Sequence, residues 1–271
     1  MTSEPCLVSV IIPARDAALT IRRAIASVLA QSYTPIEVIV VDDGSRDETA
    51  EVVRALAERD VRLIRLQDNR GAAAARNVGI EAASGEIVAF QDADDEWLAG
   101  KLEQQMDRLR SDPGLVLVAS RALFASEHRE ELGPLFGGAT PPAGPRGWVP
   151  LLARNTIATP TVVTPRRALV EAGGFDTSLP VAEDQDMWIR LRLMIRAAPL
   201  GFEPLRTIFA KRDAPMSWLK RRLRASPLVS RRHFVTKLRT MTNNHQRSAL
   251  LHVLSNWAVK SFIAFPRTAS H

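Results

Sequence analysis

The chain has 271 residues, of which 46% are hydrophobic, so it is long enough to bury a sizeable core. Its one cysteine excludes an intramolecular disulfide, and the scattered histidines argue against a structural zinc site. The apolar run at residues 7–12 is far too short for a signal sequence, so we expect a cytoplasmic protein.

The net charge of +6 is distributed unevenly along the chain. Residues 1–200 contain 22 Lys and Arg against 28 Asp and Glu, whereas residues 201–271 contain 14 against 2. Such a split is typical of a surface that meets phosphate groups, on nucleic acid or on anionic lipid. Nucleic acid is not expected as a partner, because no RNA- or DNA-binding motif accompanies the charge.

Strands and helices are predicted to alternate over residues 7–120. Five apolar, β-branched runs predict strands buried on both faces: residues 7–12, 36–41, 61–66, 86–91 and 115–120. Amphipathic segments between them predict helices, the first of which has Thr20 as its cap. The economical architecture is an α/β fold, a doubly wound and mostly parallel sheet flanked by helices.

Two acidic clusters follow predicted strands. Asp42 and Asp43 come after the second strand, and Asp92, Asp94 and Asp95 after the fourth. Because ligands of such sheets bind beyond the carboxyl ends of the strands, we expect both clusters to line one crevice. Neighbouring aspartates repel one another unless a cation or ordered donors neutralise them. Mg²⁺ or Mn²⁺ is held by one or two carboxylates plus phosphate oxygens, so a metal-bridged nucleotide diphosphate fits the pattern.

The same aspartates have a simpler explanation as helix caps. Acidic residues after a strand often cap the next helix, a task open to Asp94 or Asp95 before residues 96–98. For a lone D-x-D this explanation is the better one, and the second acidic pair shifts the balance toward a site. Residues 13–16, PARD, replace the glycine-rich turn with which many α/β proteins bind a diphosphate.

The second half of the chain departs from this alternation. Residues 133–150 are dense in Gly and Pro and predict a loop, which serves as a boundary or a lid. Residues 159–195 then predict a strand, a short helix, a Gly-Gly turn and an acidic entry into a longer helix. From residue 216 the chain is predicted to be helical, with too many polar residues for a transmembrane span.

Four segments, in this order, resemble the inverting glycosyltransferases of family 2, which have the GT-A fold. They read VSVIIPARD, VIVVDDGSRDET, NRGAAAARNVGIEAASGEIVAFQDADD and GGFDTSLPVAEDQDMWIRL. The resemblance implies a catalytic domain over residues 1–215 that binds a nucleotide sugar and an acceptor, and leaves residues 216–271 as a helical basic extension. It also implies Mg²⁺ or Mn²⁺ and a UDP-, GDP- or dTDP-linked donor, from which one sugar passes to a glycan or a lipid-linked glycan.

The resemblance also implies roles for single residues. It assigns nucleotide binding to Pro13, Ala14, Asp42, Asp43, Arg76 and Asn77. It assigns the metal to Asp92 and Asp94 of the D-x-D, with Asp95 as a further ligand. The usual aromatic-Asn pair of the family is replaced here by Arg15-Asp16. For Arg76, a solvated position on a helix surface explains the residue as well as a ligand role does.

Residues 183–186, EDQD, lie at the place of the catalytic base in the family. Inversion is a single in-line displacement, so the acceptor hydroxyl needs a general base opposite the leaving group, and the motif implies Asp184. The competing explanation is that acids at a helix start are each favoured by roughly 0.3–1 kcal/mol. Asp186 is predicted to pair with Arg190 four residues later.

Three further residues are candidates for contacts with the acceptor or the diphosphate: Glu183, Trp188 and Arg212. Trp188 fits a core position better than a sugar contact. Arg212 matches the arginine of a Tyr-Arg-x-His-like stretch in relatives, although the histidine is missing here. The Gln-x-x-Arg-Trp signature of processive synthases is absent from the sequence, so one sugar per encounter is expected.

Residues 216–240 interleave apolar and basic side chains. Such a segment would bind an anionic membrane surface, at the inner face of the membrane, and bring the site near a lipid-linked acceptor. Packing of its apolar side on the domain is an equally good explanation.

Two other functions compete with a transferase. A sugar-1-phosphate nucleotidyltransferase would need a glycine-rich loop, which PARDAAL lacks. A catalytically dead membrane scaffold would not need Asp43, the D-x-D and Asp184.

Overall fold

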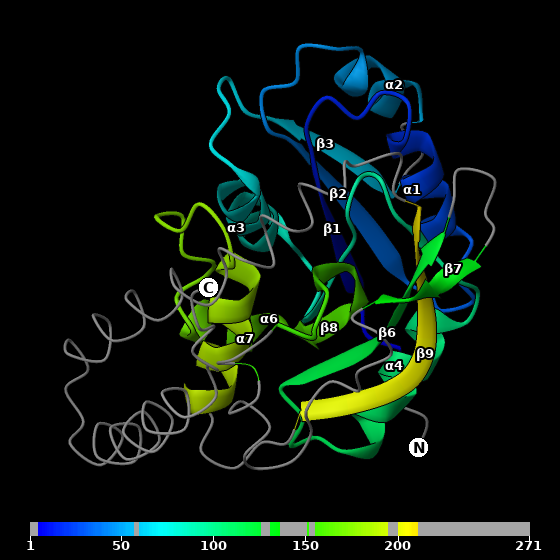
Figure 1. Ribbon diagram of the computed structural model, residues 1–271, viewed down its shortest axis with the longest axis vertical. Helices are drawn as coiled ribbons and strands as arrows, with labels where there is room; N and C mark the ends of the chain where they lie inside the picture. Colours follow the sequence, from blue (N-terminus) through cyan, green and yellow to red (C-terminus); the bar gives the residue numbers. More distant parts are fainter. Residues whose placement is uncertain are drawn as a thin grey trace, which may run out of the picture. The chain divides into compact units, whose positions relative to one another are not determined.

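The computed structural model describes residues 5–56, 60–125, 131–135, 151, 155–194 and 200–210 (Figure 1). The chain divides into two units, residues 1–227 and 228–271, and every described residue belongs to the first. The predicted basic extension and Arg212 lie outside the described residues. Within the described part of the chain, no helix is both long and apolar enough to cross a membrane.

Four parallel strands form one half of the sheet, here called the parallel half. They are β1 (Val8–Ala14), β2 (Ile36–Asp42), β3 (Val61–Arg65) and β4 (Ile87–Phe90). Their spatial order is β3-β2-β1-β4, with β1 in parallel register with both β2 and β4. The central residues of β1 and β2 are fully buried, which explains why their sequences lack polar alternation. The parallel arrangement predicted for these strands is confirmed.

Helices α1 (Ile21–Leu29), α2 (Thr49–Ala55) and α3 (Ala72–Ala82) connect these strands. In Figure 1 the parallel strands run between α1 and α3. A Cβ on Gly79 of α3 would lie 2.4 Å from Ile11 Cγ2, so α3 approaches β1 closely only because residue 79 is glycine. Thr20 is the N-cap residue of α1, as predicted, but its hydroxyl donates to Ala17 O and makes no capping hydrogen bond to the helix.

The rest of the sheet, here called the mixed half, follows β4 in space. It contains β8 (Val162–Pro165), β6 (Leu117–Ala125), β9 (Leu200–Ala210) and β5 (Glu96–Trp97), with β7 (Glu131–Pro134) beside β6. Strand β8 is antiparallel to both β4 and β6. The predicted strand at 115–120 is therefore real but does not pair with β4, because a later segment lies between them.

Among the described residues, the helices of the mixed half are α4 (Lys101–Ser111), α6 (Arg166–Glu171) and α7 (Glu183–Met194), together with the 3-10 turn Thr159–Thr161. The predicted order of strand, short helix, Gly-Gly turn and helix is confirmed for β8, α6 and α7. Trp188 of α7 is fully buried, and its ring centroid lies 6.2 Å from that of Phe90 and 5.9 Å from that of Phe175. Trp188 is thus a core residue that packs α7 against the end of β4.

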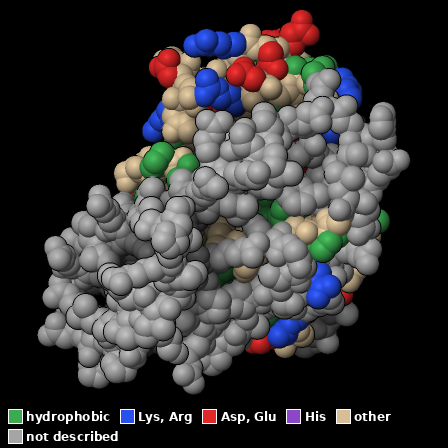
Figure 2. Space-filling view, in the orientation of Figure 1, with side chains coloured by type: hydrophobic (Ala, Val, Ile, Leu, Met, Phe, Trp, Pro, Cys, Tyr) green, Lys and Arg blue, Asp and Glu red, His purple; other side chains and the backbone are tan. Residues whose placement is uncertain are grey.

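The surface of the described residues shows no patch of one charge on the face in Figure 2. Acidic and basic side chains lie side by side at the end of the domain that carries α2.

Candidate active site

A cleft of about 730 Å³ lies at the carboxyl ends of β1, β2 and β4. Six of the residues implicated by the sequence line it: Pro13, Ala14, Asp43, Arg76, Asp92 and Asp94. The expectation that the two acidic clusters face one crevice is met by Asp43 from one cluster and by Asp92 and Asp94 from the other. Ligand pockets in proteins occupy about 300–1,000 Å³, so this cleft has room for a ligand of nucleotide size.

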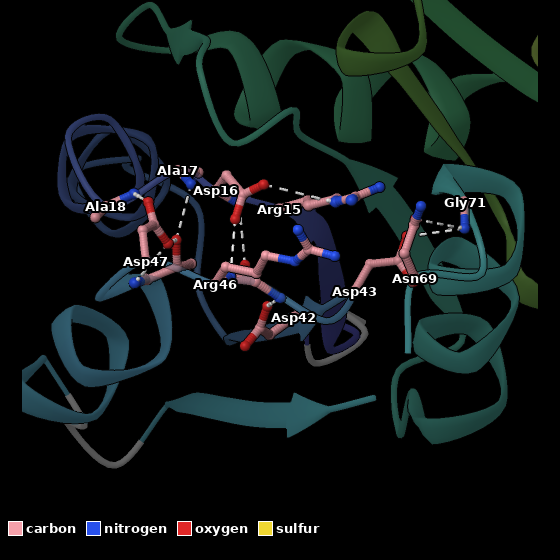
Figure 3. A network of polar contacts seen from close by, with 12 residues as sticks. Arg15, Asp16, Ala17, Ala18, Asp42, Asp43, Arg46, Asp47, Asn69 and Gly71 are labelled. Carbon is pink, nitrogen blue, oxygen red and sulfur yellow. Dashed lines mark hydrogen bonds and ion pairs between the residues drawn. The ribbon is translucent and has the colours of Figure 1, made fainter. Parts of the chain in front are cut away.

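Loops after β1 and β2 form one wall of the cleft and are hydrogen-bonded to each other (Figure 3). The Asp16 N–H donates to Ser45 Oγ (3.0 Å), and the Arg46 N–H donates to Asp16 Oδ1 (2.8 Å). The Ala18 N–H donates to Asp47 Oδ2 (3.0 Å). Asp16 has a φ of +48°, a region that Asp and Asn tolerate better than other side chains. Side-chain hydrogen bonds therefore shape this wall, and a glycine-rich turn is not needed.

Asp42 and Asp43 are neighbours in the chain with different surroundings. Asp43 accepts hydrogen bonds from the N–H groups of Arg70 (2.7 Å) and Gly71 (2.8 Å), which holds the start of α3 beside the cleft. Asp42 is fully buried, accepts from the Ser45 N–H (2.9 Å) and pairs with Arg65 (3.3 Å). The structure places Asp43 at the cleft and Asp42 behind it.

Asn77 of α3 is directed away from the cleft lining. Its Nδ2 donates to Phe175 O (2.8 Å), and its Oδ1 accepts from the Phe175 N–H (2.7 Å). A Cβ on Gly174 would lie 2.8 Å from Asn77 Oδ1, so this contact requires glycine in the Gly-Gly turn. Asn77 thus fastens α3 to the segment that leads into α7.

Arg76, the preceding residue, is buried in the described structure rather than solvated, with 4% of its surface exposed. Its guanidinium donates to Asp92 Oδ1 (3.2 Å) and Glu183 Oε1 (3.0 Å). Burial acts to lower the pKa of Arg76, but the negative charges of Asp92, Glu183 and Asp184 outweigh it and raise the pKa above its usual value. One buried cation therefore joins the D-x-D to the start of α7.

The D-x-D residues do not cap a helix. Residues 96–97 form β5, and α4 begins only at Lys101, after Gly100 in the left-handed conformation (φ +75°). The simpler explanation of these aspartates as helix caps is therefore wrong.

The three aspartates differ in their access to the cleft. Asp92 and Asp94 are partly exposed and line it, whereas Asp95 is 1% exposed and is not among the lining residues. Within the described ranges, no three His, Cys, Asp or Glu side chains are arranged to hold a metal ion. A metal at Asp92 and Asp94 would need further oxygens from a bound ligand or water.

Asp184 lies in the first turn of α7 and is 5% exposed. Its Oδ2 accepts from Asn155 Nδ2 (3.0 Å) and, at 3.4 Å, from Thr159 Oγ1, while its Oδ1 accepts from the Gln185 N–H (2.7 Å). Asn155 and Thr159 were not expected from the sequence to contact Asp184. Asn155 belongs to no predicted element and Thr159 starts the predicted strand, so no local signal links either residue to α7.

Asp186 and Lys101 are structural. Asp186 accepts from Arg190 Nε (2.7 Å), as the spacing of four residues predicts.

The Lys101 amine lies 3.7 Å from the centroid of the Trp97 ring and has no hydrogen-bond partner among the described residues. Burial lowers the pKa of Lys101 well below its usual value.

Residues 9–170, more than half of the chain, match the family model described as glycosyl transferase family 2. The chain belongs to glycosyltransferase family 2. This membership makes it an enzyme of the glycosyltransferase type and argues against the nucleotidyltransferase alternative.

Two curated relatives illustrate how far the likeness to other family 2 proteins extends. One is the UDP-Glc:alpha-D-GlcNAc-diphosphoundecaprenol beta-1,3-glucosyltransferase WfgD of Escherichia coli, 42% identical over 103 residues, which are 38% of this chain and 41% of WfgD. Another is the putative teichuronic acid biosynthesis glycosyltransferase TuaG of Bacillus subtilis, 43% identical over 109 residues, which are 40% of this chain and 43% of TuaG. The matched stretch spans less than half of the length of each relative.

Two solved structures share the fold of this family 2 glycosyltransferase. One is the mannosyltransferase PcManGT from Pyrobaculum calidifontis, solved in complex with GDP-Man and Mn²⁺. It is 26% identical with a TM-score of 0.69, and the match covers 93% of this chain and 69% of the PcManGT chain. The other is S. aureus TarS 1–349, solved in complex with UDP-GlcNAc. It is 23% identical with a TM-score of 0.62, and the match covers 77% of this chain and 59% of the TarS chain. The expected GT-A fold is confirmed.

Proposed function

We propose that this enzyme transfers one sugar per encounter, with inversion, from a nucleoside diphosphate sugar to a hydroxyl group of a glycan or lipid-linked glycan. The observation that carries the proposal is the link that the buried Arg76 makes between the partly exposed Asp92 and Glu183, the neighbour of Asp184. It brings the carboxylates suited to a diphosphate-bound metal and the carboxylate suited to a general base into one network of charges. Such an arrangement serves a displacement in which donor and acceptor must meet in line.

The nucleotide would occupy the cleft with its base near Pro13, Ala14 and Asp43. These residues line the cleft, and the hydrogen bonds that join its two loops hold that wall in place. Asp42 would support this wall from behind through the Ser45 N–H. Asn77 would act indirectly, by fastening α3, the helix that carries Arg76, to the backbone of Phe175. The donor would be linked to UDP, GDP or dTDP, in keeping with the GDP-Man bound to PcManGT and the UDP-GlcNAc bound to TarS.

The residues of the cleft fit a Mg²⁺ or Mn²⁺ ion. Asp92 and Asp94 present partly exposed carboxylates, which are the hard oxygen ligands that these ions prefer, and diphosphate oxygens would complete the coordination. The Mn²⁺ in the PcManGT complex supports this assignment. A bound ion would supply positive charge that offsets the charge developing on the departing nucleoside diphosphate. Asp95, away from the cleft lining, is the weaker candidate ligand.

Asp184 would act as the general base. As the acceptor oxygen forms its bond to the anomeric carbon, the bond from that carbon to the diphosphate oxygen breaks, and the hydroxyl proton passes to the Asp184 carboxylate. Arg76 contributes a fixed positive charge near Asp184. The neighbouring Asp186 does not compete for this role, because its carboxylate is paired with Arg190.

The acceptor is proposed from the relatives and the sequence. WfgD is named for an acceptor carried on diphosphoundecaprenol and TuaG for teichuronic acid biosynthesis, which supports a role in polysaccharide biosynthesis. Residues 216–240 would bring the enzyme to the membrane surface that holds such an acceptor, and Arg212 would contact the diphosphate. Trp188 is left out of the proposed site because its ring is in the core.

The test is a panel of nucleotide sugars, assayed with Mn²⁺ for slow donor hydrolysis and for a nucleotide-induced rise in melting temperature. We expect one nucleotide class to give both signals and chelation by EDTA to abolish hydrolysis. Asp184→Asn should retain the rise in melting temperature and lose transfer by about 10²–10⁴-fold. The proposed function would be overturned if no donor in the panel were turned over and none raised the melting temperature.

A further inference from the structure

The carboxylate of Asp184 is held by its own helix at one oxygen and from outside the helix at the other, because Oδ1 accepts from the Gln185 N–H (2.7 Å). Two side chains from the segment before β8 converge on Oδ2, with Asn155 Nδ2 at 3.0 Å and Thr159 Oγ1 at 3.4 Å. Asp184 and Thr159 are 5% and 3% exposed, so the contacts are buried. Because a carboxylate otherwise rotates about its side-chain torsions, two donors on one oxygen restrict the plane in which both oxygens lie.

We propose that Asn155 is the positioning residue of the general base, with Thr159 as a second and longer hydrogen bond to the same oxygen. The proposal rests on the proposed function, because it takes Asp184 as the base. Asn155 touches neither donor nor acceptor in this role. It directs the lone pairs of the carboxylate toward the place where the acceptor hydroxyl must lie, since proton transfer requires hydrogen-bond geometry.

The amide of Asn155 is itself held in one orientation. Its Oδ1 accepts from the Ile157 N–H (3.1 Å), so the opposite end of the amide, Nδ2, is the end that faces Asp184. The backbone of residues 155–157 thus orients Asn155, and Asn155 orients Asp184. This chain of contacts gives the base a direction that helix α7 alone does not supply.

The charges around Asp184 explain why the orienting group is neutral. Arg76 of α3 faces Asp184 together with Asp92 and Glu183, while Asp186 on the same helix is paired with Arg190. A second carboxylate beside Asp184 would favour its protonated form, whereas an amide donor favours the ionised form. Asn155 therefore orients Asp184 without placing a further negative charge beside it.

The decisive variant is Asn155→Asp. It keeps an acceptor for the Ile157 N–H, so the local turn is preserved, but replaces the donor to Asp184 by a carboxylate. We expect kcat to fall about 10–100-fold with the donor KM unchanged, and the acidic limb of the pH profile to move to higher pH. The matched control is Thr156→Ala, which should keep both kcat and the profile, because its hydroxyl has no hydrogen-bond partner among the described residues.

A reciprocal exchange separates orientation from folding. In Asn155→Asp combined with Asp184→Asn, donor and acceptor exchange places, so the melting temperature should recover relative to the Asn155→Asp single variant while transfer stays lost. If Asn155→Asp does not fold, Asn155→Ala is measured by the same kcat, KM and pH readouts. We expect the same fall in kcat, with a smaller shift of the acidic limb because alanine removes the donor without adding a negative charge.

The two proposals fail in different ways. An Asp184→Asn enzyme with full transfer would show that the base itself is wrong. An inactive Asp184→Asn enzyme beside an Asn155 variant with the wild-type kcat and pH profile would overturn the positioning role alone.

Discussion

The parallel half and the mixed half hold their site residues by different means. In the parallel half, Asp43 binds backbone N–H groups, so the chain itself is the partner. In the mixed half, Asp184 accepts from the Gln185 N–H but also from the side chains of Asn155 and Thr159. Glu183 accepts from the side chain of Arg76, so side chains are partners on this side as well. Backbone groups survive most substitutions, whereas a side-chain partner is lost with one. We therefore expect the acceptor side to be the more sensitive to substitution at positions outside the motifs.

The largest effect is expected at Arg76, the residue that joins the two halves. Arg76→Met would leave Asp92 and Glu183 without their shared cation, and breaking a buried pair lowers the free energy of unfolding by about 3–5 kcal/mol. The measurement is urea denaturation followed by Trp fluorescence.

The matched control for Arg76 is Arg54→Met, because Arg54 is exposed and pairs with Glu51 on the surface. Its free energy of unfolding should change by less than about 0.5 kcal/mol. Equal changes at the two arginines would mean that Arg76 does not join the halves energetically.

A smaller effect, confined to the donor side, is expected for Asp43→Asn. The single oxygen of the amide can accept from only one of the two backbone N–H groups. The other N–H group then faces the NH2 group of the asparagine, which lowers the free energy of unfolding by about 1–3 kcal/mol. The nucleotide-induced rise in melting temperature should shrink as the start of α3 loosens. Asp68→Asn, an exposed position, serves as the control and should keep both stability and the thermal shift.

The smallest effect is expected at Lys101, and it depends on pH. Because burial lowers its pKa in the folded protein, the unfolded chain binds the proton more tightly, and wild-type stability should rise with pH between the folded value and about 10.4. Lys101→Met should be more stable than wild type at neutral pH by roughly 1 kcal/mol, part of the gain being offset by the lost contact with Trp97.

The stability difference at Lys101 should narrow as the pH approaches about 10.4, where the unfolded chain also loses the proton. Thermal melts of wild type and Lys101→Met from about pH 6 to about pH 10 measure this trend. Gln104→Met, exposed on the same helix, should show no such trend. A constant difference at Lys101 would argue against a lowered pKa.

Much of the parallel half could be predicted from the sequence. Apolar, β-branched runs identified β1 to β4. Asp43 after β2 and Asp92 and Asp94 after β4 do reach one cleft, because parallel strands end at a common edge. The mixed half could be predicted only as a list of elements. That β8 lies between β4 and β6 depends on pairing between segments far apart in the chain, which periodicity does not report.

By itself the sequence determined the family, the strand ends and the acidic motifs, because these follow from local composition and spacing. Only the tertiary structure decided which of two residues adjacent in the chain faces the cleft. Arg76 turns to the cleft and Asn77 to Phe175, since successive helical residues point about 100° apart and packing selects the face. Asp42 and Asp43 diverge because they stand at the end of β2, where successive side chains point to opposite faces. Asn155 meets Asp184 only because folding brings the segment before β8 against α7.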